Sequence, residues 1–347
     1  MVSVSLRHGH GDLFFKPTKF IKQIFFTLFA MNKTVKMIRS VLMLVLLAMV
    51  NSCDLINEDL PECVQSVQFV YDMTLSGGDA FNAQVGSVDL YVFDDQGNFV
   101  KKYSESGEAL KDPNYRVTLN LANGNYTLVA WCGMMDNGFT LSPFTTLTEM
   151  QNAISDVQNG ISSSDLKAMW YGYQEITMNA NEAKTHVVHL TKDTNNIRVM
   201  LQNVDGRAID GNNFDFSILD NNTVVDWQNT PSSAVTYKPF VQGTQQVGGS
   251  ENEAPVDVAY AEFSTSRLYV GNKARLVITN KENGQVVLDI PLLDYLTMRS
   301  EKYMKMSNQE YLDRECDYSL VLFLGDNNTW LRTTIIINGW TVRVNNI

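Results

Sequence analysis

The chain has 347 residues, with 27 Lys and Arg against 38 Asp and Glu, and a formal net charge of −11 at pH 7. An acidic surface repels phosphate backbones, so this balance argues against a nucleic-acid-binding protein. There are four cysteines and none forms a CxxC pair, which excludes a dense disulfide framework and gives no support to a zinc site.

The N-terminal region has the build of a secretion signal. Basic residues from Lys33 to Arg39 precede an apolar run at residues 41–50, and small residues then lead to Cys53. A run of about ten apolar residues is too short for a transmembrane helix, which needs roughly twenty. We therefore expect residues 1–52 to comprise an upstream extension and a signal peptide that is cleaved off.

The residues before Cys53 resemble the bacterial lipobox. In that motif the cysteine thiol receives a diacylglyceryl group and the peptide bond before it is cleaved, so Cys53 is the candidate lipidation site, as S-diacylglycerol and N-palmitoyl cysteine. The alternative is a secreted protein with an unrelated cysteine near its cleavage site. Removal of residues 1–52 leaves 20 Lys and Arg against 37 Asp and Glu. Acyl chains, each methylene contributing about 0.8 kcal/mol, would then have to supply the membrane attachment.

The rest of the chain is rich in β-branched and aromatic runs separated by turn residues, as in "VDLYVFDDQGNFVKKY" and "YRVTLNLANGNYTLVAWCG". Such strand–turn–strand units predict an all-β sandwich. A polar stretch near Thr191 separates two arrays of strands, so we predict one domain over residues 53–190 and another over 191–347. Hairpin turns are expected at Asp95–Asn98, Asn123-Gly124, Glu282–Gly284 and Asn338-Gly339.

Two stretches interrupt the strand pattern, and we expect them to be short helical insertions. In the segment Thr146–Met169, the spacing of Leu147, Met150 and Ile154 predicts one helical face. The segment Leu292–Leu312 is predicted to be helical or irregular.

The chain carries little sign of catalytic chemistry. His186 and His189 lie three apart in a strand-like run and would point to opposite faces, so they cannot share a metal. The turn "FDDQGN" lacks the ligand spacing of an EF-hand, and Cys132 is expected to be a buried apolar residue. There is no GxSxG, HExxH or glycine-rich phosphate loop. We therefore predict no catalytic residues, metal or cofactor, although a hydrolase with spatially paired carboxylates would leave no local spacing.

Several segments together resemble the fimbrial anchor subunit family of Bacteroidales. They are the acidic leader "CDLINEDLPEC", the strands "FVYDM", "LYVFDDQGNFV" and "YTLVAWCG", the junction "TNNIRVML" and the ending "YLDRECDYSLVLFLGDNNTWLRTTIIINGWTVRVNNI". The leader and the ending are the most specific of these, and the likeness covers nearly all of the chain after Cys53.

The resemblance implies two transthyretin-like Greek-key β-sandwich domains in tandem. It also implies a lipoprotein of the outer membrane, exposed on the cell surface, that holds a fimbrium at its base and limits its length. Its partners would be the fimbrial stalk subunit (fimbrillin) and accessory tip subunits. In this group an acidic leader accompanies surface export, and here Asp54, Glu58 and Asp59 would form it.

The distribution of arginine bears on this role. The resemblance implies that stalk subunits are cut by an arginine-specific protease after an N-terminal strand, which opens a groove for a neighbour's donor strand. No Arg occurs between Cys53 and Tyr115, and Arg116 is the first. A chain without the cut site keeps its first strand, as an anchor requires; the alternative is that Arg is simply scarce here.

The C-terminal segment is the candidate contact with a partner. Alternate apolar residues could add as a strand to an incomplete sheet of the neighbouring subunit. The alternative is a hairpin that closes the second domain's own core. The candidate residues are Ile335, Ile337, Trp340, Val342 and Val344.

A second class of function is a fimbrial tip adhesin or a glycan-binding surface lipoprotein. Five Trp and fourteen Tyr could supply faces for sugar stacking, although aromatic residues of a sandwich more often fill its core.

Overall fold

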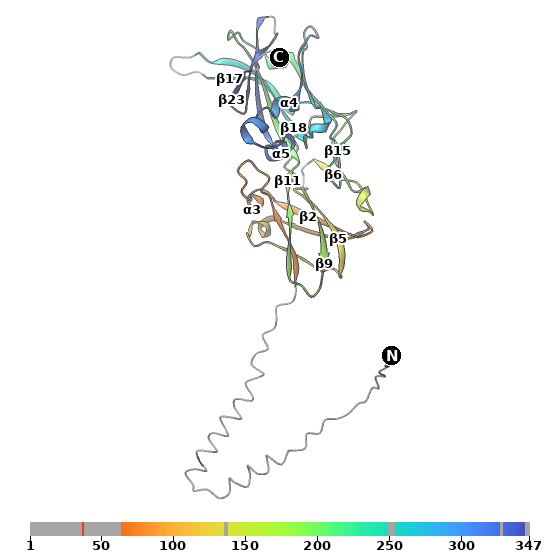
Figure 1. Cartoon of the computed structure of the whole chain (residues 1–347). Coiled ribbons are helices and arrows are strands. Elements are labelled where there is room, and N and C mark those ends of the chain that lie inside the picture. Colours follow the sequence, from red (N-terminus) through yellow and green to blue (C-terminus); the bar gives the residue numbers. More distant parts are fainter. Residues whose placement is uncertain (1–36, 38–63, 135–137, 249–253, 327–328, 344–347) are drawn as a thin grey trace, which may run out of the picture. The chain divides into compact units, whose positions relative to one another are not determined.

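The structure, a computed structural model, describes Met37 and residues 64–134, 138–248, 254–326 and 329–343 (Figure 1). Contacts divide the chain into two units, Met1–Glu62 and Cys63–Ile347, and every described strand belongs to the second unit.

The first lobe of this unit has two sheets with an apolar core between them. One sheet has the strand order β10-β1-β4 and the other has the order β11-β9-β5-β2-β3. Alternate side chains of each strand turn inward, and Phe69, Leu90 and Leu128 are among those that meet in the core. The strands are β1 (Gln65–Val70), β2 (Ser87–Asp94), β3 (Phe99–Ser106), β4 (Val117–Leu119), β5 (Gly124–Cys132), β9 (Trp170–Met178), β10 (Lys184–His189) and β11 (Thr191–Lys192).

The second lobe also has two main sheets. Their orders are β17-β18-β12-β21-β22-β23 and β20-β19-β13-β16-β8, and Val199, Phe216 and Leu322 lie in the core. The strands are β8 (Ile161–Ser162), β12 (Thr194–Asn203), β13 (Phe214–Asp220), β16 (Val235–Tyr237), β17 (Val241–Val247), β18 (Val256–Ser266), β19 (Arg275–Asn280), β20 (Val286–Pro291), β21 (Asp317–Leu324), β22 (Trp330–Ile337) and β23 (Trp340–Arg343). Two β-sandwich lobes with few helices confirm the predicted fold class.

The chain changes from one lobe's sheet to the other's between Lys192, the end of β11, and Thr194, the start of β12. This change lies beside the domain boundary expected near Thr191, and the boundary itself stays a prediction. A single boundary does not separate the two lobes completely. Residues 139–162 precede the change of sheet in the chain, yet they pair with strands that come after this change.

The prediction of one helical face over Thr146–Met169 is wrong. Leu147, Met150 and Ile154 are all buried, but only a single 3-10 turn forms, η4 (Leu147–Glu149), which a capping box of Thr146 and Glu149 begins. The residues after it are rich in Asn, Ser and Gly, which favour turns over helix. They form β7 (Gln151–Ile154) and β8, and β7 joins β6 (Phe139–Leu141), β14 (Val224–Asp226) and β15 (Pro231–Ser232) in a four-stranded sheet.

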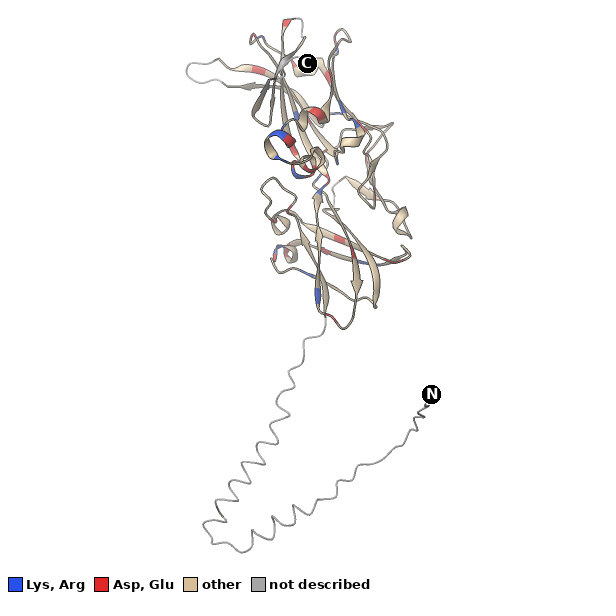
Figure 2. Cartoon of the chain, in the orientation of Figure 1, with Lys and Arg blue, Asp and Glu red and all other residues tan. Residues whose placement is uncertain are grey.

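The prediction that Leu292–Leu312 is helical or irregular is confirmed. α4 (Leu292–Leu296) is followed by a π-helical turn, η7 (Ser300–Met304), and by α5 (Asn308–Arg314), whose first turn is capped by the Ser307 hydroxyl. Figure 2 shows acidic and basic segments next to one another in this region. No helix among the described residues is both long enough and apolar enough to span a membrane. The other short helices are α3 (Phe81–Gln84), η3 (Gly107–Lys111), η5 (Gly211–Asn213) and η6 (Val270–Asn272).

Three of the four predicted hairpin turns are confirmed. Asp95–Asn98 joins the paired strands β2 and β3, Glu282–Gly284 joins β19 and β20, and Asn338-Gly339 joins β22 and β23. Asn123-Gly124 is different, because β4 and β5 belong to separate sheets and this turn carries the chain from one sheet to the other.

Candidate functional site

The C-terminal hairpin is part of the second lobe's six-stranded sheet. Ile337 pairs with Leu320 and Ile335 with Leu322 across the β21–β22 ladder, and both isoleucines are fully buried. Two of the five candidate contact residues therefore pack in the core of their own lobe. This is the position that a closing hairpin requires.

The last strand, β23, is an edge of that sheet. It pairs with β22 alone among the described strands, so its other edge is unpaired. Trp340 at its start is 58% exposed, and the Arg299 guanidinium lies 4.3 Å from the centre of its ring. The backbone of Val342 pairs with Ile335, while the side chain of Val342 and all of Val344 lie outside the described residues. The candidate partner surface is thus the β23 edge, and contact through it stays a prediction.

The turn before β23 is held by its first residue. Asn338 has φ 46° and Gly339 has φ 77°, the pair of left-handed conformations typical of a tight hairpin. The Asn338 side chain also accepts a hydrogen bond from the Ser319 amide at 2.7 Å. This turn therefore sets the position at which β23, the last described strand of the sheet, begins.

At the other end of the chain, β1 is an interior strand. It lies between β10, with which it runs parallel, and β4, with which it runs antiparallel. Val67 and Phe69 are buried in the first lobe's core, and Gln65 donates to the Asn179 carbonyl at 2.7 Å. The first described strand is therefore fixed on both edges and on its inner face.

The predicted lipidation site Cys53 and the acidic leader residues Asp54, Glu58 and Asp59 lie outside the described residues. Nothing in the structure bears on them, and their roles stay predictions.

The two histidines lie on β10, as predicted, with different surroundings. His186 is buried, and its Nε2 lies 2.9 Å from Oε1 of Gln65; burial, together with the charge of Lys184, lowers the pKa of its imidazole. His189 is exposed and lies 3.1 Å from the Asp72 carboxylate. The described residues contain no cluster of His, Cys, Asp and Glu suited to a metal.

The described cysteines are both free. Cys132 is fully buried on β5, as expected, and burial raises the pKa of its thiol. Cys316 is half-buried, accepts a hydrogen bond from Lys192 Nζ at 3.3 Å, and has a thiol pKa that burial raises. Neither has the lowered pKa of a reactive thiol.

The turn at Asp95–Asn98 is organised by the carboxylate just before it. Asp94 accepts hydrogen bonds from the backbone amides of Gln96 and Asn98 at 2.9 and 2.8 Å, and Gly97 has φ 79°. These hydrogen bonds lower the pKa of the Asp94 carboxyl, and those from Asn98 have the largest effect. The predicted tight turn explains this acidic stretch.

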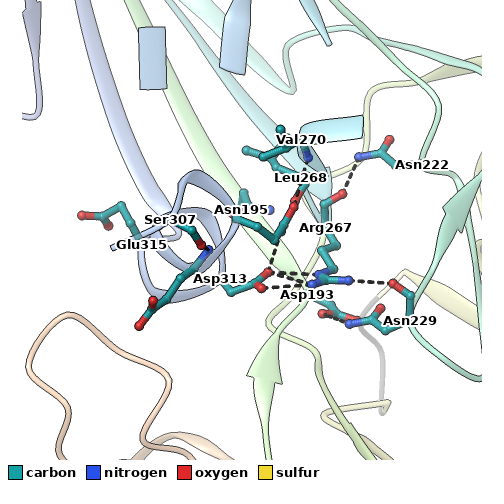
Figure 3. A network of polar contacts seen from close by, with 12 residues as sticks. Asp193, Asn195, Asn222, Asn229, Arg267, Leu268, Val270, Ser307, Asp313 and Glu315 are labelled. Carbon is teal, nitrogen blue, oxygen red and sulfur yellow. Dashed lines mark hydrogen bonds and ion pairs between the residues drawn. The ribbon is translucent and has the colours of Figure 1, made fainter. Parts of the chain in front are cut away.

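A polar network that the sequence did not predict lies where the chain changes lobes (Figure 3). Arg267 pairs with Asp313, Nη2 to Oδ1 at 3.0 Å, and both side chains are about 15% exposed. Arg267 Nη1 donates to the Asn229 carbonyl at 2.7 Å, and the Asn229 side chain donates to Asp193 at 2.8 Å. These residues are far apart in the sequence, and the polar stretch around Asp193 was the one local signal.

Asp193 has the most unusual surroundings in this network. It is fully buried, and only one of its two carboxyl oxygens has a hydrogen-bond partner among the described residues. Burial raises the pKa of the carboxyl to about 7, against the opposing effects of the Arg267 charge and of the Asn229 hydrogen bond. Burial disfavours the charged form of such a carboxyl, so the junction is less stable when Asp193 is charged than when it is protonated.

A comparison with the models of known protein families gives a match over most of the chain. The family of "Fimbrillin-A associated anchor proteins Mfa1 and Mfa2" matches residues 60–346. No curated protein matches significantly.

Solved structures give further matches. A candidate adhesin of Bacteroides thetaiotaomicron is 34% identical with a TM-score of 0.74, covering 82% of this chain and 100% of its own. A candidate polysaccharide-binding protein of the same organism is 32% identical with a TM-score of 0.72, covering 82% and 99%. The fimbrial anchor protein Mfa2 of Porphyromonas gingivalis shares the fold, at 17% identity and a TM-score of 0.61, covering 81% and 99%. With the family match spanning most of the residues after Cys53, the chain belongs to the fimbrillin-A associated anchor protein family.

Proposed function

We propose that this chain is a non-catalytic structural subunit that anchors a fimbrium to the cell surface and limits its length. Family membership supports a fimbrium-associated role at the cell surface. The finer role as the foot of the filament is the proposal, and one structural observation carries it.

That observation is the position of β1. Val67 and Phe69 are 0% and 2% exposed, and β1 has a neighbouring strand on each side. Full burial of such side chains contributes about 1.5–3 kcal/mol each. With no Arg between Cys53 and Tyr115, an arginine-specific protease has no site at which to release this strand. The groove that a donor strand would enter therefore stays filled by the chain's own β1.

The N-terminus supplies the attachment in this proposal. Cys53 carries the lipid, residues 1–52 are removed, and Asp54, Glu58 and Asp59 form the export leader. The protein then sits on the outer membrane through its acyl chains, with the domains 53–190 and 191–347 exposed at the surface. A retained β1 is what keeps the folded lobes joined to that lipid.

The partner is the fimbrial stalk subunit, and accessory tip subunits are further candidates. The β23 edge supports this part of the proposal, because it combines a strand edge that pairs with no described strand and an exposed aromatic residue, Trp340. Strand addition there would use main-chain hydrogen bonds of β23 and leave Ile335 and Ile337 in the lobe's own core.

The test is metabolic labelling with a fatty-acid analogue in cells with wild-type protein or with Cys53→Ala. We expect the variant to lose the label and its fimbriae to be shed or to grow abnormally long. Cys316→Ala is the matched control and should keep both label and attachment. Loss of label with fimbriae still attached and of normal length would contradict the anchor role.

A second candidate function is that of a tip adhesin or glycan-binding lipoprotein. Two relatives above 30% identity are described as a candidate adhesin and a candidate polysaccharide-binding protein. Tyr173 is 46% exposed and its ring meets Trp227 edge-on, with 6.2 Å between the ring centres. Exposed aromatic faces of this kind can stack on sugar rings. Strong signals on a glycan array that Tyr173→Ala abolishes would favour this function over anchoring.

A further inference from the structure

The short helix α5 of the second lobe contacts the first lobe through its last residue, Arg314. The Nη1 of Arg314 donates hydrogen bonds to the carbonyls of Asp72 and Thr74, at 3.3 and 3.0 Å. These two residues follow β1, the interior strand of the first lobe. The Nε of Arg314 donates to Glu310 of the same helix at 3.0 Å, so the guanidinium is aligned by the helix that carries it. This contact between the lobes therefore depends on the position of the last turn of α5.

The residue before Arg314 in that turn, Asp313, is held by the second lobe itself. Nε and Nη2 of Arg267 both donate to the Asp313 carboxylate at 3.0 to 3.1 Å, which is the fork geometry of a two-point ion pair (Figure 3). Arg267 comes directly after β18, so the pair ties the end of α5 to the six-stranded sheet. Opening this fork would release the turn that positions Arg314.

The same guanidinium also faces the carboxyl of Asp193. Nη1 of Arg267 donates to the Asn229 carbonyl at 2.7 Å, and the Asn229 side chain donates to Oδ1 of Asp193 at 2.8 Å. Asp193 is fully buried, and its Oδ2 has no hydrogen-bond partner among the described residues. The charge of Arg267 favours ionisation of this carboxyl. An ionised Asp193 would thus need a donor at Oδ2, and Arg267 is the cation that could supply it.

The other charged and titratable groups around Asp193 come from several elements. Asp313 on α5 opposes its ionisation. Tyr171 on β9 interacts with Asp193 and with Asp226 of β14, but burial, together with these carboxylates, raises the pKa of its hydroxyl, so it stays neutral. Nζ of Lys192, the preceding residue, donates to a thiol instead. Ionisation of Asp193 would therefore leave two carboxylates in competition for one guanidinium.

We propose that the proton on Asp193 controls how firmly α5 holds the first lobe. While the carboxyl is neutral, Arg267 keeps its fork on Asp313 and the last turn of α5 stays in place. When the carboxyl loses its proton to solvent, the guanidinium turns toward Asp193, the fork on Asp313 opens and Arg314 loosens its contact. Burial raises the pKa of Asp193 to about 7, so the change falls near neutral pH. This device does not depend on the proposed function.

The test is amide hydrogen exchange of the purified full chain at pH 5 and pH 8, with each rate corrected for the intrinsic effect of pH on exchange. Residues 71–80 and 308–315 report on the two sides of the contact. The switch variant is Asp193→Asn, which keeps the shape of the side chain but cannot ionise. Asp220→Asn is the matched control, because burial also raises the pKa of Asp220, to about 6, while its hydrogen bonds come from Asn221 and Asn272, outside this network.

We expect both segments of wild type to lose protection about fivefold or more between pH 5 and pH 8. Asp220→Asn should show the same loss, and Asp193→Asn should change less than twofold. The strands β1 and β21 are the internal reference, and their protection should change less than that of the two segments. A loss of equal size in β1 and β21, or a loss that persists in Asp193→Asn, would overturn the proposal.

Arg314→Gln separates the two sides of the contact, and Arg314 lies at the surface of the lobes, with 24% of its side chain exposed. In this variant residues 71–80 should lose protection at both pH values and cease to respond to pH, while residues 308–315 still respond. A response of residues 71–80 that remains would contradict coupling through α5. His189→Gln removes the imidazole that lies 3.1 Å from the Asp72 carboxylate and should leave both responses unchanged. If the responses disappear with it, His189 and not Asp193 is the switch.

Discussion

The first and the last described strands of the molecule have opposite environments. β1 is an interior strand with a neighbour on each side and two buried side chains, Val67 and Phe69. β23 is an edge strand with one neighbour, and its first residue, Trp340, is more than half exposed.

This contrast indicates which of the two strands is open to a partner. Replacing or removing β1 would open a gap inside a sheet, whereas pairing at β23 would extend a sheet that already ends there. The proposed anchor role would use this asymmetry, since one end would remain joined to the membrane while the other contacts the filament.

The largest expected effect comes from truncating the interior strand. Phe69→Ala should lower the free energy of unfolding by about 3–5 kcal/mol, because it leaves a cavity in the core. Trp340→Ala, the matched change at the edge, should cost about 1 kcal/mol or less, chiefly the loss of its contact with Arg299. Denaturant unfolding of both variants measures this. Equal losses would mean that β23 is as much a part of the core as β1.

A smaller effect on stability is expected from the titration of Asp193, which lies where the chain crosses from the lobe of β1 to the lobe of β23. The pKa of Asp193 is raised from 3.8 to about 7. This shift corresponds to a loss of at most about 4 kcal/mol of folding stability when the buried carboxyl is charged. Because the folded-state pKa is raised, the stability that protonation contributes is fully present below about pH 3.9 and is lost as the pH rises through about 7.

The measurement is the difference in unfolding free energy between wild type and Asp193→Asn across this range. The free energy of unfolding of wild type should rise relative to that of the variant as the pH falls from 8 to 4, since the amide of the variant cannot titrate. Arg267 and Asp313 are present in both proteins, so their contributions largely cancel in the difference. A difference that does not vary with pH would show that Asp193 titrates normally.

The smallest effect is expected at the turn that places the edge strand. Asn338→Ala should destabilise by about 1–2 kcal/mol, because alanine is strained at the φ of 46° found there. Asn338→Gly is the control, since it loses the same side chain but accepts that backbone conformation. Thermal unfolding compares the two. If glycine costs as much as alanine, the hydrogen bond from Ser319, and not the backbone, holds the turn.

Local sequence patterns predicted the local structure well. The alternating runs became strands, Asp95–Asn98 and Asn338-Gly339 became hairpin turns, and Leu292–Leu312 became helical. Each of these depends on the preferences of neighbouring residues, which a sequence displays directly.

The features that the sequence did not predict depend on distant residues. The periodicity of Leu147, Met150 and Ile154 fitted a helix, but β7 forms because β6 and β14 offer edges to pair with. Arg267 and Asp193 meet only through the fold, so neither residue stood out in the sequence.

The shared sheets also determine how the molecule would carry a pulling force. The chain leaves the first lobe after β5, contributes β7 and β8 to sheets that include second-lobe strands, and returns at β9. Stretching the lobes apart would therefore load the β7–β14 and β8–β16 ladders as well as the crossing of the chain near Asp193. Tension applied between the two ends of the protein would be borne by several strands in parallel, and not by one linker.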